Sequence, residues 1–373
     1  MVLAYCIYII LLVLSYTSAS HNYKLLTISN QNIQSIEKNN VYWRWPLFIA
    51  FFSIIFIVGF RYDVGVDYMG YYRDFYGLGW AHHWEGKISR YEFGYEAILR
   101  TLIYFNFKVW TLFTIIAVFI WYFFIQSFKI FPFLLKWGLF FAFTTGFFFA
   151  SMNGMRQTIA LAIFMYTIKY IEKESLTKYV VYIILASSFH TSILLVLPFY
   201  FFINKISFTN QRWLIIYIIT YIVGNKLDIK DVILFGLDLF PKYQHYTDRF
   251  LEDFSNPISG GFGNFYLFFV GFVIILLSKD LIKKAPKLKI YYNLFFIGAI
   301  MFNFFWKYDI LGRIYYLFIW FKIFCMAALV YYLGKSKNSW LIYLLIITQL
   351  TMFIYKIYKG ENLCSPFQFE FMA

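Results

Sequence analysis

Long, continuous runs of apolar residues recur along this chain, and short polar connections separate them. Most runs approach the roughly 17–25 residues with which a helix spans the hydrocarbon core of a bilayer. A transmembrane barrel would instead need segments of about ten residues with alternating polarity, which these runs lack. The pattern predicts helices near residues 2–17, 45–60, 109–127, 137–151, 155–171, 179–203, 212–225, 261–278, 290–306, 313–333 and 339–357.

The composition agrees with a chain that lies in lipid. Hydrophobic residues make up 61% of the 373 residues, aromatic residues 25% and charged residues only 14%, and the mean hydropathy is +0.64. A bilayer requires backbone hydrogen bonds to be satisfied within each span, which continuous helices achieve. We therefore expect an all-α, polytopic helical bundle of about 10–12 transmembrane helices, folded as a single membrane domain over residues 1–373. No Lys or Arg precedes the first apolar run, so we interpret it as a helix and not as a signal peptide.

The net charge of +14 does not indicate a nucleic-acid partner. Its Lys and Arg residues are spread over the connections between apolar runs, which is how membrane proteins set their orientation. The strongest positive connections, 279–289, 172–178 and 335–337, are expected in the cytoplasm. The three cysteines are far apart and lack metal-binding spacing, and no His-Glu-x-x-His motif occurs. The sequence therefore suggests no metal and no cofactor.

The orientation of these loops conflicts with a model in which every apolar run crosses the membrane once. Three crossings would then lie between the loops 172–178 and 279–289 and would place them on opposite sides. The run 179–203 is the best candidate for an exception, since polar residues around His190 interrupt its middle. We expect a broken or re-entrant element there, with His190 near its tip. The outward connections are then 61–108, 152–156, 226–260, 307–312 and the tail from about residue 358.

A polar and aromatic segment follows the second apolar run, at the start of outer loop 61–108. Its candidate functional residues are Arg61, Asp63, Asp67, Tyr68 and Tyr71. Aromatic rings stack on the apolar faces of sugars, and charged groups bind sugar hydroxyls, so this combination favours carbohydrate recognition. The alternative is an amphipathic helix at the membrane interface, where Tyr and Trp are common.

Ionisable residues near the apolar runs are the other candidates. Arg156, followed by Gln157, opens a helix with small residues at a spacing of four, and an arginine in the membrane costs about 2.5–3.5 kcal/mol on insertion scales. Arg313 also lies at the outer start of a helix, where a bound anion would explain a cation. His190 is the only histidine within an apolar run. Snorkelling of Arg156 to the interface and simple packing of His190 are the competing interpretations.

The second outer loop, 226–260, contains Tyr246 and Arg249 as candidate substrate-binding residues. Its glycines lack the spacing of a phosphate-binding loop, so we interpret this segment as a lid over the site.

Three motifs in the same order resemble the EpsG family, a branch of the Wzy-type polysaccharide (O-antigen and exopolysaccharide) polymerases. They are Arg-Tyr-Asp-Val-Gly-Val-Asp-Tyr at 61–68, Asn-Gly-Met-Arg-Gln at 153–157 and Ser-Phe-His-Thr-Ser at 188–192. The resemblance spans most of the chain and implies a membrane glycosyltransferase with a fold similar to the GT-C type. It would work without a metal in the bacterial cytoplasmic (inner) membrane, with its active site on the outer face.

The resemblance implies transfer of a growing glycan from undecaprenyl diphosphate to a lipid-linked repeat unit. The partners would be undecaprenyl-diphosphate-linked oligosaccharide repeat units, the lipid bilayer and a chain-length regulator, for products such as capsule or exopolysaccharide. Arg156 and Arg313 would bind the diphosphate, with Arg61 as a third arginine. His190 is the first candidate for the general base and Asp67 the second.

Three other functions share parts of this pattern. An O-antigen ligase would use the same diphosphate-binding arginines with a different acceptor. A flippase or transporter of lipid-linked glycans would place charges at several depths and often contains repeated halves, and the sequence shows no internal repeat. A purely structural membrane subunit would tolerate alanine at Arg156, His190 and Arg313.

Overall fold

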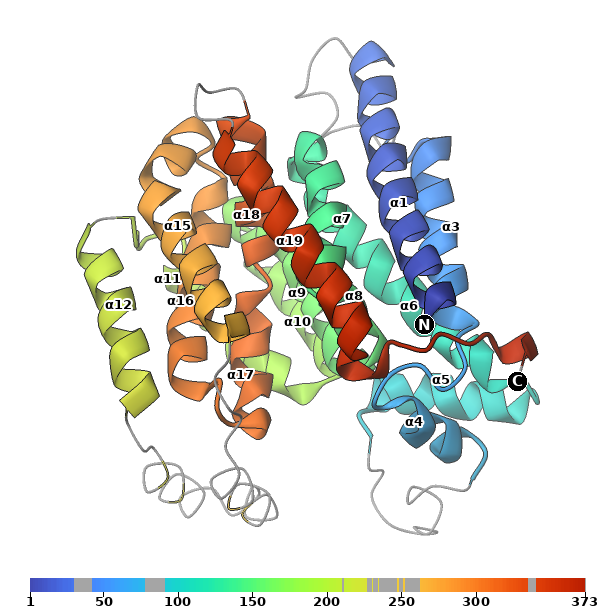
Figure 1. Ribbon diagram of the computed structural model, residues 1–373. Coiled ribbons are helices and arrows are strands. Elements are labelled where there is room, and N and C mark those ends of the chain that lie inside the picture. Colours follow the sequence, from blue (N-terminus) through green and yellow to red (C-terminus); the bar gives the residue numbers. More distant parts are fainter. Residues whose placement is uncertain are drawn as a thin grey trace. The chain divides into compact units, whose positions relative to one another are not determined.

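The computed structural model describes residues 1–29, 42–77, 91–209, 211–226, 262–334 and 340–372, and the single residues 230, 234, 247 and 251. These parts of the chain are helical, apart from turns and an isolated antiparallel bridge between Arg61 and Phe369 (Figure 1). The chain divides into two compact units. Unit 1 comprises Met1–Tyr200 and Met326–Ala373, and unit 2 comprises Phe201–Cys325. This division does not test the expectation of a single membrane domain, which stays a prediction.

Four long helices form the centre of unit 1: α1 (Val2–Ser29), α3 (Trp45–Gly59), α6 (Val109–Ser127) and α9 (Met155–Glu172). Helix α3 packs on both α1 and α6, and α6 packs on α9. Helix α1 extends well beyond the expected end at residue 17. Its buried Asn22 explains the extension, because the Asn22 side chain donates to the Tyr42 carbonyl (3.3 Å) and accepts from the Arg44 amide (3.1 Å), which fixes the approach to α3.

The run expected as one helix over 137–151 is two helices, α7 (Leu135–Thr144) and α8 (Phe147–Met152). Gly146 lies between them with φ +95°, in the left-handed region that glycine adopts without steric cost. The chain then breaks again at residues 153–154 before α9 begins.

The predicted break in 179–203 is confirmed. Helix α10 (Leu176–Ser187) ends before His190, which is extended (φ −157°, ψ 114°), and a 3₁₀ helix (Thr191–Val196) and α11 (Phe199–Phe202) follow. The Tyr179 hydroxyl donates to the Val196 carbonyl at 2.7 Å and ties the two arms together. Helix α10 has 12 residues and is therefore about 18 Å long. The second arm, Thr191–Phe202, combines 3₁₀ and α-helix, and both arms are shorter than the roughly 30 Å hydrocarbon core.

Loop 61–108 contains two helices that the hydrophobic pattern did not predict, α4 (Tyr68–Phe75) and α5 (Phe93–Tyr104). The C-terminal tail returns to this loop after α19 (Trp340–Lys359). The Tyr62 amide donates to the Gln368 carbonyl (2.9 Å), and the Glu370 amide donates to the Phe60 carbonyl (2.8 Å). Helices α4 and α5 and the C-terminus thus lie at the same end of unit 1 (Figure 1).

Unit 2 consists of α12 (Gln211–Lys226), α15 (Phe262–Lys284), α16 (Leu288–Phe305) and α17 (Asp309–Ile319), followed by the start of α18 (Lys322–Leu333). The helix expected over 313–333 is broken between α17 and α18. Asn303 on α16 is fully buried and donates to the Tyr217 carbonyl (3.2 Å) and the Thr220 hydroxyl (3.0 Å) of α12. This buried polar contact fixes how the two helices pack.

Six helical segments in the described parts of the chain are long and apolar enough to cross a membrane: Val2–Ile28, Val109–Ile130, Gly263–Lys284, Leu288–Phe305, Leu311–Leu333 (α17 and α18 together) and Trp340–Lys359. Apolar side chains such as Ile10 (65% exposed) and Ile347 (59% exposed) point away from the protein, as lipid-facing residues do. The predicted polytopic helical membrane protein is confirmed. The expected total of about 10–12 crossings stays a prediction.

Candidate active site

Arg156 lies in the first turn of α9, directly after the chain break at 153–154. Its guanidinium Nη1 is 2.5 Å from Glu92 Oε2, and its Cζ lies 4.6 Å from the ring centre of Tyr91 and 5.7 Å from that of Tyr95. The side chain is 25% exposed. Its Nε is buried without a hydrogen-bond partner among the described residues. Arg156 is therefore a partly enclosed cation with a donor available for a further acceptor.

Glu92 directly precedes α5 and connects Arg156 with the tip of the broken element. Its Oε1 accepts the Thr191 amide at 3.2 Å and lies 3.3 Å from His190 Nδ1. Burial by itself would raise the pKa of Glu92, but the neighbouring imidazole of His190 and the positive charge of Arg156 outweigh burial and lower this pKa to about 2. Glu92 is thus a carboxylate at neutral pH.

The imidazole of His190 is 17% exposed, and its Nδ1 faces the Glu92 carboxylate. The direction between the two atoms departs from that of a good hydrogen bond. Because Nδ1 faces Glu92, Nε2 lies on the opposite edge of the ring.

A close backbone contact holds α5 against the tip of the broken element. The Gly94 amide donates to the Ser188 carbonyl at 2.7 Å. A Cβ atom at Gly94 would lie 2.4 Å from Ser188 Oγ and 2.9 Å from Ser188 O, closer than such atoms approach. Only glycine allows this approach, which places Glu92 beside His190.

Tyrosines from α4 and α5 form the wall around Arg156. The Arg156 guanidinium donates to the hydroxyl of Tyr71, whose ring is buried against Tyr95. The hydroxyl of Tyr91, whose ring covers the guanidinium, donates to the Asp74 carboxylate. A ring face attracts a cation, so this wall stabilises the charge of Arg156 without occupying its Nε donor.

The EpsG family model matches residues 44–369, which is most of the chain. The chain belongs to the EpsG family. EpsG is a Wzy-like polymerase family, and the matched region contains Glu92, Arg156 and His190. Comparisons with curated proteins and with solved structures find no match.

Arg61, in the first of the EpsG-like motifs, is completely buried. Its guanidinium donates to the carbonyls of Val58 (2.5 Å), Val64 (2.9 Å) and Met152 (2.8 Å), and its Cζ lies 4.6 Å from the ring centre of Phe113. Burial lowers the pKa of Arg61 to about 10, so it stays charged at neutral pH. These contacts connect the motif to the chain break before α9 and favour a structural role over substrate binding.

The carboxylates of the first motif are placed differently. Asp63 is exposed and has a left-handed backbone (φ 47°), and Asp67 is exposed at the start of α4. Gly65 between them has φ +110°, and a Cβ atom there would come within 2.9 Å of Asn153 Oδ1. The second motif, which includes Asn153, therefore packs directly on the first.

The remaining predicted residues fall into three groups. Tyr68 is buried, with its ring on Phe113 and its hydroxyl 3.2 Å from Glu370 Oε2 of the tail, and Gln157 is half-buried beside Arg156 in α9. Arg313 is exposed on α17 of unit 2. Tyr246 and Arg249, like the loop 78–90, lie outside the described residues.

Glu92 and Gly94 are the site residues that the sequence prediction missed. A glycine two positions after a carboxylate, at the start of an apolar helix, was the available signal. Among the described residues, no group of three His, Cys, Asp or Glu side chains is arranged to hold a metal ion.

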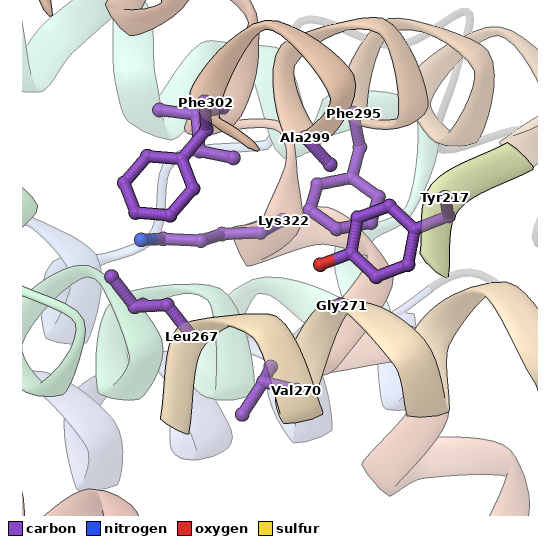
Figure 2. Close-up of a pocket in the computed structure, with 9 residues that line it drawn as sticks. Tyr217, Leu267, Val270, Gly271, Phe295, Ala299, Phe302 and Lys322 are labelled. Carbon is purple, nitrogen blue, oxygen red and sulfur yellow. The ribbon is translucent and has the colours of Figure 1, made fainter. Parts of the chain in front are cut away.

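A separate pocket lies within unit 2 of this EpsG-family chain, lined by side chains of several of its helices (Figure 2). Its lining is mostly apolar and includes Tyr217, Leu267 and Phe302. Lys322, at the start of α18, extends into it and is only 7% exposed, with its Nζ 4.6 Å from the ring centre of Trp320. None of the residues predicted from the sequence lines this pocket.

Proposed function

We propose that this EpsG-family protein is a polysaccharide polymerase. It transfers a growing glycan from undecaprenyl diphosphate to a lipid-linked repeat unit at the outer face of the bacterial cytoplasmic membrane. The observation that carries the proposal is the cluster in which the Glu92 carboxylate joins Arg156 and His190. It combines an anion-binding cation and a candidate base within one small site.

Arg156 is assigned to the donor diphosphate. The leaving group gains negative charge as the glycosidic bond breaks, and a guanidinium stabilises such charge with directed hydrogen bonds. The unused Nε donor of Arg156 supports this assignment. Stabilisation by arginine makes the proposed reaction independent of a metal ion.

His190 is assigned as the general base. The acceptor hydroxyl oxygen attacks the anomeric carbon of the donor sugar while its proton passes to His190. The bond from the anomeric carbon to the diphosphate oxygen breaks, and its electron pair leaves with undecaprenyl diphosphate. Direct displacement inverts the anomeric configuration. Asp67, exposed nearby in the sequence motif, is the second candidate for the base.

The other predicted residues keep supporting roles in the proposal. Tyr71 holds Arg156, and we propose that Asp63 binds sugar hydroxyls and that Gln157 contacts sugar or diphosphate. Arg313, Tyr246 and Arg249 are proposed substrate contacts from the second half of the chain. Arg61 and Tyr68 are proposed to support the fold, because both are buried in protein contacts. A chain-length regulator remains a proposed partner.

The distribution of lysines supports an outward-facing site. Lys129 follows α6, Lys173 follows α9, and Lys178 lies in the first turn of α10. Helices α6 and α9 begin at the end of unit 1 that holds Glu92 and Arg156, so these lysines lie at the opposite end. Positively charged connections favour the cytoplasmic side. The site would then face outward, where lipid-linked repeat units are joined.

The test is the banding of surface polysaccharide in a deletion strain complemented with wild type, Arg156→Ala, His190→Ala or Arg313→Ala. Arg100→Ala is the matched control, because Arg100 is 77% exposed and its partner among the described residues is Glu96 on its own helix. We expect single-repeat glycan in place of the ladder for the first three variants and a normal ladder for the control. Each protein is first shown to reach the membrane.

Loss of all surface glycan in the deletion strain would indicate ligation or flipping instead. Normal ladders from all three variants would reject the proposed site and support a structural subunit.

A further inference from the structure

The two oxygens of the Glu92 carboxylate contact different functional groups. Oε2 is 2.5 Å from Arg156 Nη1, whereas Oε1 accepts the Thr191 amide at 3.2 Å and faces His190 Nδ1 at 3.3 Å. The Glu92 side chain is only 15% exposed, so these contacts are poorly screened by solvent. The Glu92 carboxylate thus occupies Nη1 of Arg156, the residue that binds the donor diphosphate in the proposed function.

We propose that Glu92 is a positioning residue that holds His190 for the reaction and occupies Arg156 until the donor diphosphate replaces it there. This inference rests on the proposed function of Arg156 and His190. Glu92 would contact both Arg156 and His190 in the resting protein, and would lose its contact with Arg156 when the donor diphosphate binds.

The exchange follows from charge. Carboxylate and phosphate oxygens are both good acceptors for a guanidinium, and two anions on one cation in a poorly solvated site repel each other. A diphosphate that binds through the unused Nε side of Arg156 therefore weakens the contact of Glu92 with Nη1. The other oxygen of Glu92 keeps its amide donor, Thr191, so the carboxylate stays at the tip of the broken element.

The consequence is an order of assembly. Before donor binds, the negative charge of Glu92 is shared between Arg156 and His190. Once the charge of Arg156 is neutralised by diphosphate, the Glu92 carboxylate faces His190 alone and stabilises the positive charge that the ring gains when it takes the proton of the acceptor hydroxyl. Donor binding would thus complete the site, which limits reaction before the donor is in place.

Inorganic pyrophosphate is the probe for the exchange. Its binding is measured calorimetrically with the purified full-length protein in nanodiscs, for wild type, Glu92→Gln, Arg156→Ala and the control Glu96→Gln. Glu96 lies one turn further along α5, is 16% exposed and also pairs with an arginine. Polymer formation from lipid-linked repeat units is measured in parallel.

The expected results move in opposite directions for Glu92→Gln. Pyrophosphate binds about tenfold more tightly than to wild type because a competing anion is gone, while polymer formation falls at least about tenfold because His190 loses its partner. Glu96→Gln resembles wild type in both measurements, and Arg156→Ala no longer binds pyrophosphate. A merely structural ion pair would not tighten anion binding when broken.

Unchanged or weaker pyrophosphate binding by Glu92→Gln would overturn the inference, and so would undiminished polymer formation. If Glu92→Gln does not accumulate, Glu92→Asp serves instead, since its shorter side chain no longer spans both partners and should also tighten pyrophosphate binding. Tighter pyrophosphate binding by the variant, with no polymer from the wild type, would support the exchange and reject the polymerase.

Discussion

The close contact between Gly94 and Ser188 gives the sharpest mutational prediction. A methyl group added at residue 94 would lie 2.4 Å from Ser188 Oγ and 2.9 Å from Ser188 O. The hydroxyl can rotate away, but the carbonyl belongs to the backbone and also accepts the Gly94 amide at 2.7 Å. Overpacking of this kind costs about 1–3 kcal/mol, and loss of the hydrogen bond costs about 1 kcal/mol more.

We expect Gly94→Ala to relieve this strain by moving the start of α5 away from the tip of the broken element. Glu92, two residues earlier, moves with it and loses its contact with His190. A displacement of about 1 Å at a reacting group can reduce a rate about 100-fold. We therefore expect polymer formation to fall about 10–100-fold while the protein still reaches the membrane.

The assay compares polymer ladders and initial rates in membranes that contain equal amounts of each variant. Gly70→Ala is the matched control, because Gly70 also lies in a short helix of the same loop and a Cβ atom there would meet nothing within 4 Å. Gly70→Ala should keep the wild-type rate. Wild-type activity for Gly94→Ala would refute the claim that this contact positions Glu92.

Three further predictions follow from the same geometry. The pKa of Glu92 is lowered from 4.5 to about 2. Its ionised form therefore contributes up to about 3 kcal/mol to the free energy of unfolding above pH 5. The difference in thermal stability between wild type and Glu92→Gln should shrink as the pH falls from 4.5 toward 2. Arg61→Lys should lower the melting temperature in detergent, because one ammonium group cannot replace three directed bonds to backbone carbonyls. Tyr72 belongs to a partly exposed tyrosine cluster, in which its ring lies 4.9 Å from that of Tyr76 and 6.2 Å from that of Tyr62. Tyr72→Ala should raise the KM for the acceptor several-fold in steady-state assays. Tyr72→Phe should stay close to wild type, because stacking on a sugar needs only the ring.

The helices that were predicted correctly are those in which hydrophobicity alone decides the structure. The run 109–127 coincides with α6, because continuous apolar side chains leave no alternative to a helix in lipid. The break at His190 was predictable because polar side chains interrupt the run. The break at Gly146 was not, since a left-handed glycine within an apolar run leaves no change in polarity.

The residues of the site also differ in whether the sequence alone reveals them. Arg156 and His190 stand out in sequence because ionisable residues are rare in apolar runs. Glu92 lies in a loop with many charges, and its importance arises from contacts with residues 64 and 98 positions away. Arg61 and Arg156 are both arginines, but the Arg61 side chain is buried and donates to three backbone carbonyls. The spacing of residues along the chain does not indicate this difference.

The central claim is tested most directly by the purified protein in proteoliposomes supplied only with undecaprenyl-diphosphate-linked repeat units, with products separated on gels and identified by mass spectrometry. The account predicts that wild type forms a ladder of longer glycans and releases undecaprenyl diphosphate with each new linkage, whereas His190→Gln and Arg156→Lys form none. No elongation by the wild-type protein, or a full ladder from His190→Gln, would contradict it.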